Sequence, residues 1–267
     1  MGASRLPGKV LLPMGNHMVL AQVCRRAAQI KGIDTDDIII ATTREDIDDD
    51  IIYWADNNDT DVFRGEENDV LSRYYHAAKG RGADTVIRVT ADCPCIDPEV
   101  ISAMLEEFRN SDVDYMSNTL KRSFPHGLDA EVFSFAALER AFNEATEAPH
   151  REHVTPYIYR SGKFRLADYM NKAYEPGLED IRVTLDTPGD YALLTALYTI
   201  LGDDFLLADI TAAFKNYPWL GSINADVVQK KVYDSLDAEI HDAAELLKLH
   251  GMGRACEILS KAAKETQ

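Results

Sequence analysis

The chain has 267 residues, of which 46% are hydrophobic, and its formal net charge is −17 at pH 7. A chain of this length can bury a full core as one large domain, or as one domain with a smaller appendage. The negative charge argues against nucleic acid and against an anionic membrane surface as partners, because both would repel the protein at long range.

Short β-branched runs alternate with helical patterns along the first half of the chain. In order, the periodicity predicts a helix at 18–30, a strand at 37–42, a helix at 46–56, a strand at 60–64, a helix at 70–79, a strand at 84–90, a helix at 98–108 and a strand at 113–116. Parallel strands joined by crossover helices produce such an alternation, so the pattern predicts an α/β fold with a doubly wound, mostly parallel sheet.

The order loosens after residue 124. Further strands are predicted at 130–133 and 164–169, and a core strand at 181–185 precedes a helix that starts at Pro188. From about residue 226 the sequence is helical to its end. The chain is therefore expected to divide into an α/β domain over residues 1–225 and a C-terminal helical extension over residues 226–267, which would serve packing or dimerisation.

Neither export nor a redox role is indicated. The apolar stretches are short and regularly interrupted, and no signal-peptide pattern is present, so the sequence predicts a cytoplasmic protein that does not span a membrane. Cys24, Cys93, Cys95 and Cys256 are scattered, and the pair around Pro94 has no second pair at metal-ligand spacing. A zinc or disulfide framework is not expected.

The first nine residues, MGASRLPGK, combine small and cationic side chains. Gly2 and Gly8 permit close approach of the backbone to phosphate oxygens, while Arg5 and Lys9 supply fixed positive charge. The stretch does not fit the Walker A pattern, because five residues separate the two glycines and Val10 follows the lysine. A phosphate-binding loop and a basic surface turn both remain open at this point.

Two aspartates follow predicted strands at one rim of the sheet. Asp92 stands just beyond the strand at 84–90, and Asp186 comes directly after the strand at 181–185. Ligands of open α/β sheets bind at the carboxyl ends of strands, and Mg²⁺ takes one or two protein carboxylates together with water and substrate phosphates. Asp186 could instead cap the following helix. Beside a second carboxylate and a cationic loop, the metal interpretation is favoured.

Several motifs, in order, resemble those of the cytidylyltransferase family, which makes CMP-activated sugars. They lie at 2–9 (GASRLPGK), 63–75 (FRG followed by NDVLSRYY), 90–94 (TADCP) and 185–188 (LDTP). Segments at 124–133, 151–159 and 223–230 resemble the spore-coat polysaccharide branch, which is related to the acylneuraminate and ketodeoxyoctulosonate enzymes. The resemblance covers nearly the whole chain and implies a nucleotide-diphospho-sugar transferase-like fold.

The resemblance implies transfer of CMP from CTP to a small sugar of acidic or ulosonic type, with release of pyrophosphate, Mg²⁺ as cofactor and a homodimeric enzyme. Expected catalytic residues are Arg5, Lys9, Asp92 and Asp186, of which the two aspartates would hold the metal. Expected nucleotide contacts are Gly2, Ser4, Arg5, Gly8, Lys9, Asp69 and Arg73. Expected sugar contacts are Gly127, Asp129, Glu131, Arg151 and His153.

Some of these roles have competing interpretations. Asp69 and Arg73 could act as a helix cap and a solvated charge, and Arg151 could make a surface ion pair instead of meeting a sugar carboxylate. Strand alternation would place Asp129 and Glu131 on one face. His150 and His153 have the spacing of zinc ligands, yet no third ligand matches them, so substrate contact or helix capping is preferred.

Two other classes of protein remain open. A nucleotide-sugar-dependent glycosyltransferase usually shows an Asp-x-Asp pair, which Asp92-Cys93-Pro94 does not provide. A non-catalytic nucleotide-binding homologue would keep the fold without turnover. The resemblance also places a hydrophobic strand before the opening loop, so this chain is expected to lack the first strand and to be a shortened form that binds CTP poorly and melts at low temperature.

Overall fold

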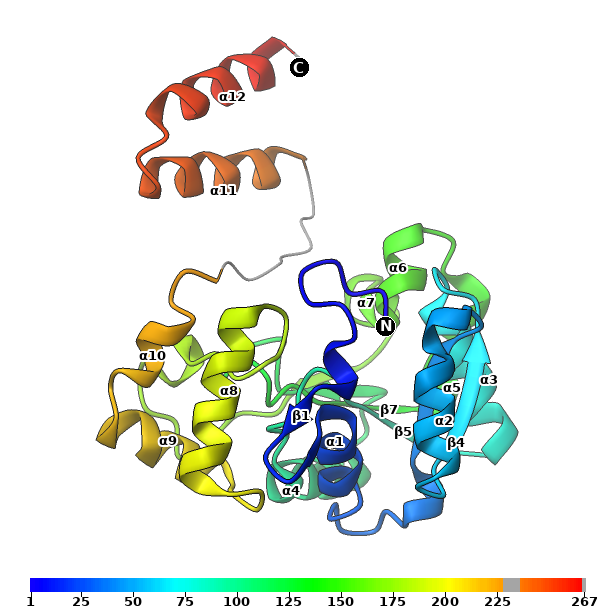
Figure 1. Cartoon of the computed structure of the whole chain (residues 1–267). Helices are drawn as coiled ribbons and strands as arrows, with labels where there is room; N and C mark the ends of the chain where they lie inside the picture. The colour runs from blue at the N-terminus through cyan, green and yellow to red at the C-terminus, as the bar shows by residue number, and fades with distance from the viewer. Residues whose placement is uncertain (228–235, 266–267) are drawn as a thin grey trace. The chain divides into compact units, whose positions relative to one another are not determined.

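The computed structural model describes residues 1–227 and 236–265. It forms two compact units, Met1–Val227 and Val228–Gln267, which are described one at a time (Figure 1). Within the described residues no helix has both the length and the apolar character needed to cross a membrane.

Helices and strands alternate through the first unit. The helices are α1 (Val19–Ala27), α2 (Asp49–Asp56), α3 (Val70–Arg81), α4 (Pro98–Arg109), α5 (Phe135–Glu144), α6 (Ala148–His153), α7 (Pro156–Arg160), α8 (Pro188–Leu201), α9 (Leu207–Asn216) and α10 (Leu220–Ile223). The strands are β1 (Pro13–Met14), β2 (His17–Met18), β3 (Ile39–Thr43), β4 (Asp61–Gly65), β5 (Thr85–Arg88), β6 (Tyr115–Ser117), β7 (Glu131–Ser134) and β8 (Leu166–Asp168).

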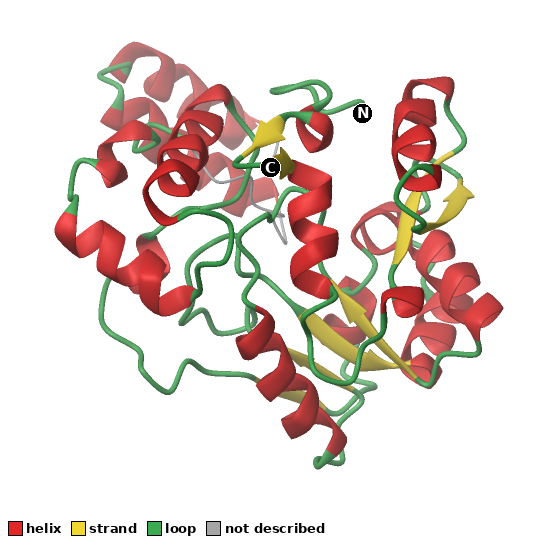
Figure 2. Cartoon of the chain, turned by 60° about the horizontal axis from the view of Figure 1, so that its bottom comes forward, coloured by secondary structure: helices red, strands yellow, loops and turns green. Residues whose placement is uncertain are grey.

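The strands form three separate groups, drawn in yellow in Figure 2. Strands β1 and β2 make a short antiparallel hairpin, and β3 pairs in parallel with β4. The four-stranded sheet has the order β5-β7-β6-β8, in which β7 is antiparallel to both of its neighbours and β8 is parallel to β6. The predicted α/β class is confirmed. The described strands pair in both parallel and antiparallel directions, and β3 and β5 belong to different sheets.

The segment at 181–185 is not a regular strand, although its alternating apolar residues predict one. Its backbone makes a single bridge, between Arg182 and His126, and the amide of Leu185 donates to the carbonyl of Asp92 at 2.8 Å. Both neighbours are irregular loops, so no ladder can extend along them. Gly127 has φ +106°, and an added Cβ would lie 2.5 Å from the Val183 carbonyl carbon, so only glycine fits this approach.

Two hydrophobic clusters hold the first unit together. The larger cluster packs α1, α4 and α8 around the buried 181–185 segment. The smaller one lies between α3, α5 and α7, where the rings of Tyr75 and Phe142 stack with their centroids 4.1 Å apart. Because one cluster supports the loops that carry Asp92 and Asp186 and the other supports the start of α3, the predicted site residues are mounted on two distinct cores.

The second unit is a pair of helices, α11 (Leu236–Leu249) and α12 (Gly253–Glu265), which pack against each other. Cys256 is buried in this pair, whereas Leu236, Met252 and Ile258 expose apolar side chains. The predicted C-terminal helices are therefore present. Residues 228–235, for which the sequence also predicts helix, lie outside the described residues.

Candidate functional site

Lys9 joins three distant parts of the chain. It starts a short 3₁₀ helix, Lys9–Leu11, directly after Gly8, whose φ of 69° is left-handed. Its ammonium Nζ donates to Asp92 Oδ2 at 2.7 Å and to Asp186 Oδ1 at 2.8 Å. The opening loop and both predicted metal ligands therefore meet at one point.

Hydrogen bonds to the main-chain carbonyl of Asp92 link the loops that carry the two aspartates. The carbonyl of Asp92 accepts from the amide of Leu185 at 2.8 Å and from Thr184 Oγ1 at 3.2 Å. Thr90 Oγ1 donates to Asp92 Oδ1 at 2.6 Å and so orients that carboxylate. The two loops are thus linked through their main chains, and their carboxylates face the same ammonium group.

Asp186 lies among several cations. Arg182 Nη2 donates to its Oδ2 at 2.7 Å, and Arg5 Nη2 lies 3.3 Å from the same oxygen. Burial alone would raise the pKa of the Asp186 carboxyl, but Lys9 and Arg182 outweigh it and hold that pKa below its usual value. Burial likewise disfavours the charged form of Lys9, yet Asp92 and Asp186 raise the pKa of its ammonium group. Lys9 and Asp186 are therefore both held in their charged forms at neutral pH.

Asp190 fixes the position of Arg182. This fully buried carboxylate accepts from Arg182 Nε at 2.9 Å and from Asn224 Nδ2 at 2.9 Å. It also accepts from the amides of Asp186 and Thr187, each at 3.0 Å. The side chain of Thr187 caps the start of α8, which leaves the carboxylate of Asp186 to Lys9 and the arginines.

The donor set of this cluster suits a hard divalent cation. One oxygen of Asp92 and one of Asp186 already lie within 2.8 Å of a single cationic nitrogen. Mg²⁺ commonly uses one or two carboxylates and completes its shell with water and phosphate oxygens. In the described part of the chain no group of three or more His, Cys, Asp or Glu side chains converges. A metal here would therefore depend on the two aspartates and on oxygens from substrate or water.

The other predicted nucleotide contacts lie at the junction of β4 and α3. Asp69 caps α3 by accepting from the amide of Ser72 at 2.9 Å, and Arg151 Nη2 donates to its other oxygen at 2.5 Å. Arg73 is buried and donates to the carbonyls of Glu66 and Glu67, at 2.7 and 3.1 Å. Arg73 therefore holds the loop before α3 in place.

A hollow of about 360 Å³ lies at this junction and is strongly acidic. Its lining residues are Glu45, Glu66, Glu67, Asn68, Asp69, Ala148 and Arg151. The sequence assigned Asp69 to the nucleotide and Arg151 to the sugar, whereas the structure joins the two side chains in one ion pair. Arg151 also donates to the carbonyl of Phe142 at 2.8 Å, so its guanidinium group is anchored to α5.

The remaining predicted sugar contacts have different environments. Asp129 is partly exposed and pairs with Arg122 through two hydrogen bonds of 2.7 and 3.0 Å. Glu131 is buried in β7, where it accepts from Arg88, from Tyr115 and from Thr155. Because β7 begins only at Glu131, strand alternation does not apply to Asp129, and the structure does not bring the two carboxylates together.

His153 and the predicted opening-loop contacts complete the set. His153 ends α6 and is followed by Val154, a buried β-branched residue with a left-handed φ of 73°. That turn brings Thr155 to Glu131, with 2.5 Å between Oγ1 and Oε1. Gly2 and Ser4 lie in the loop that precedes the short helix of Lys9.

Sequence reasoning did not find Arg182 and Asp190, which orient Asp186, or Arg88, which binds Glu131. A signal was present, since the two segments IRVTADC and IRVTLDT each place an arginine inside a run of β-branched and apolar residues that predicts a strand. A charge that such a run partly or fully buries requires a partner. Arg88 and Arg182 therefore marked two internal ion pairs.

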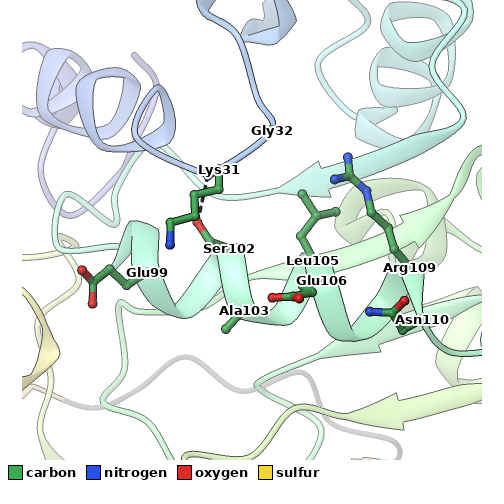
Figure 3. Close-up of a pocket in the computed structure, with 9 residues that line it drawn as sticks. All are labelled: Lys31, Gly32, Glu99, Ser102, Ala103, Leu105, Glu106, Arg109 and Asn110. Atoms are coloured by element: carbon green, nitrogen blue, oxygen red, sulfur yellow. Dashed lines mark hydrogen bonds between the residues drawn. The ribbon is translucent and has the colours of Figure 1, made fainter.

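A second hollow lies away from these residues (Figure 3). It has a volume of about 640 Å³ and is formed by α4 and by the chain around Lys31 and Gly32, where the amide of Lys31 donates to Ser102 Oγ at 2.9 Å. Basic and acidic side chains both line it, and none of the predicted site residues does. The site assignment therefore rests on the ionic cluster around Lys9.

The comparison with known proteins agrees with the motifs. The sequence profile of a family described as cytidylyltransferase matches residues 1–206. The spore coat polysaccharide biosynthesis protein SpsF of Bacillus subtilis is 31% identical over 208 residues, covering 76% of this chain and 85% of that protein. A 3-deoxy-manno-octulosonate cytidylyltransferase of Chelativorans is 28% identical over 207 residues, covering 70% of this chain and 79% of that enzyme.

A solved structure is similar over most of the chain. It is a cytidylyltransferase from Leptospira borgpetersenii, with 32% sequence identity and a TM-score of 0.76, and the match covers 87% of this chain and 95% of that one. Both the fold class and the resemblance drawn from the motifs are thereby confirmed. The chain belongs to the cytidylyltransferase family.

Proposed function

We propose that this protein transfers CMP from CTP to a hydroxyl group of a small sugar, releasing pyrophosphate, with Mg²⁺ as its cofactor. The observation that carries the proposal is the contact of Lys9 Nζ with both Asp92 and Asp186, at 2.7 and 2.8 Å. This contact joins a cationic, glycine-containing loop to two carboxylates, the groups that handle a triphosphate and a divalent cation. Family membership and the names of the relatives supply the reaction type.

In this proposal the residues of the cluster act mainly by position and charge. Lys9 and Arg5 neutralise the triphosphate, and the backbone around Gly2 and Gly8 lies close to its oxygens. Mg²⁺ bound by Asp92 and Asp186 would stabilise charge on the α-phosphate and lower the pKa of the attacking hydroxyl. The sugar hydroxyl attacks the α-phosphorus in line, its proton passes to solvent, and the bond to the pyrophosphate leaving group breaks.

We further propose that the acceptor is an acidic sugar of ulosonic type. Two arginines support this choice, since Arg122 binds the predicted acceptor residue Asp129, and Arg151, itself a predicted acceptor residue, binds Asp69. A guanidinium group that already holds a carboxylate has the geometry to hold a sugar carboxylate instead. The relative from Chelativorans is named for an octulosonate, which has a carboxylate of this kind.

The test is a matrix of the four nucleoside triphosphates against acidic and neutral sugars, with Mg²⁺ present and pyrophosphate release as the readout. Pyrophosphate from CTP with an acidic sugar, and a CMP-sugar mass in the products, is the expected result. Asp92→Asn serves as the matched inactive control. Binding of CTP without release of pyrophosphate from any acceptor would contradict the proposal, as would turnover of preformed nucleotide-sugars alone.

We also propose a homodimer. Support comes from the second unit, in which a pair of helices exposes Leu236, Met252 and Ile258 although the unit is too small to bury a core of its own. Light scattering after gel filtration should give twice the chain mass, and Ile258→Asp should shift the protein towards the monomer. A monomer at all concentrations would refute this part of the proposal.

A further inference from the structure

The carboxylate pair of the candidate site already holds a cation that belongs to the chain. Lys9 Nζ lies 2.7 Å from Asp92 Oδ2 and 2.8 Å from Asp186 Oδ1. We propose that Lys9 is the resident counter-cation of this pair and excludes divalent cations until nucleotide phosphates draw its ammonium group away. This inference rests on the proposed function, because it assigns the order in which that site takes its metal and its nucleotide.

The outer oxygens of both aspartates are engaged elsewhere. Asp92 Oδ1 accepts from Thr90, and Asp186 Oδ2 accepts from Arg182 and lies 3.3 Å from Arg5. The oxygens that face each other are those bound to Lys9. A divalent ion shared by the two carboxylates would therefore take the position that Nζ now fills, and the two cations would repel strongly at such short range.

The ammonium group of Lys9 is able to leave this position. Its side chain is 14% exposed, and the side chains of Asp92 and Asp186 are 26% and 21% exposed, so solvent reaches the cluster. Lysine is an unbranched, rotatable side chain that carries a compact charge, and a triphosphate offers it a stronger anionic partner. The partners of Arg182, in contrast, include the fully buried Asp190, which keeps that arginine in place.

Two consequences follow for binding. Divalent metal should bind the free protein weakly, and nucleotide should strengthen metal binding by withdrawing Lys9 from the carboxylates. Because coupling between two ligands is reciprocal, metal should strengthen nucleotide binding by the same factor. Removing the ammonium group should open the metal position without nucleotide and reduce this coupling.

The experiment measures Mn²⁺ binding by electron paramagnetic resonance of the free ion, with and without a non-reactive α,β-methylene analogue of CTP. Without nucleotide, Lys9→Met should bind Mn²⁺ about tenfold more tightly than the wild type, a size typical of coupled sites. The analogue should tighten Mn²⁺ binding strongly in the wild type and much less in Lys9→Met. Lys31→Met, which removes the same charge at the distant second hollow, should behave as the wild type.

Two further variants make each outcome decisive. Adding Asp92→Asn to Lys9→Met should abolish the gain in Mn²⁺ affinity, which locates the bound ion at this pair. Unchanged or weaker Mn²⁺ binding in Lys9→Met, with a normal thermal unfolding curve, would overturn the inference. The single variant Asp92→Asn is also measured with the analogue present. If it bound Mn²⁺ as tightly as the wild type, the metal site assumed in the proposed function would be wrong, and this outcome differs from the one that overturns the role of Lys9.

Discussion

Replacing Asp190 by asparagine removes one negative charge from the centre of the first unit. The wild-type carboxylate is fully buried and accepts from Arg182, from Asn224 and from the backbone at the start of α8. Asparagine has nearly the same shape, but its NH₂ group would face donors, and the Nε of Arg182 would lose its anionic partner. The variant therefore changes charge and hydrogen bonding with little change in volume.

The expected loss of stability is large. Removing one partner of a buried ion pair costs roughly 3–5 kcal/mol, and because Asp186 still binds Arg182 we expect about 3 kcal/mol. In a domain of this size each kcal/mol corresponds to about 2–4 °C, so the melting temperature should fall by about 6–12 °C. Asp204→Asn is the matched control, because its side chain is 79% exposed and should contribute under about 1 kcal/mol.

The pH dependence follows from the direction of the pKa shift. Burial raises the pKa of Asp190, but Arg182 and Asn224 outweigh it and leave that pKa below its usual value. A lowered carboxyl pKa gives stability that is present above the unfolded value of about 3.9 and is lost as pH falls through the folded value. Differential scanning calorimetry from pH 7 to pH 3 should therefore show wild type and Asp190→Asn converging in acid. A melting temperature at pH 7 within about 2 °C of the wild type would refute this reasoning.

Asp92→Asn should lower the rate of pyrophosphate release by about a thousandfold with an unchanged circular dichroism spectrum, because the amide is a poor ligand for a hard cation, and a loss of only a few-fold would contradict the assigned role. Lys9→Ala should raise the KM for CTP more than the KM for the sugar, since its proposed partner in turnover is the triphosphate; an effect on the sugar alone would show that the loop does not serve the nucleotide. Gly127→Ala should destabilise the first unit by roughly 2 kcal/mol or more, measured by urea unfolding, because the new Cβ would lie 2.5 Å from the Val183 backbone at a left-handed φ. An unchanged unfolding midpoint would show that the loop around Gly127 accommodates the added Cβ at little cost and would contradict the argument from close packing.

Local sequence signals were sufficient for most helices of the first unit and for its fold class. The predicted helices at 70–79 and 98–108 correspond to α3 (Val70–Arg81) and α4 (Pro98–Arg109), because caps and periodicity act within one turn. The segment at 181–185 was predicted wrongly as a strand, since a strand also needs a regular neighbour. The segment beside it comes from more than fifty residues away in the chain, so the local sequence does not show whether that segment is a strand.

The candidate site was only partly accessible to the same reasoning. Placing Asp92 and Asp186 at one rim predicted their proximity, and the structure brings both to Lys9. The partners of these two arginines could not be predicted, because Arg88 pairs with Glu131 on the neighbouring strand and Arg182 pairs with Asp190 at the start of a helix. The pairing of each arginine with its carboxylate depends on tertiary packing, and the sequence pattern alone does not show it.

The main-chain link between Asp92 and Leu185 has an evolutionary consequence. Because backbone groups make the link at 2.8 Å, the hydrogen bond itself does not require a particular side chain at Asp92 or Leu185. The intervening stretch, 93–184, includes the predicted acceptor residues Gly127, Asp129 and Arg151. In the proposed function, substitutions at partly exposed acceptor side chains such as Asp129 would leave this main-chain link intact, so acceptor choice could diversify while the proposed metal ligands stay together.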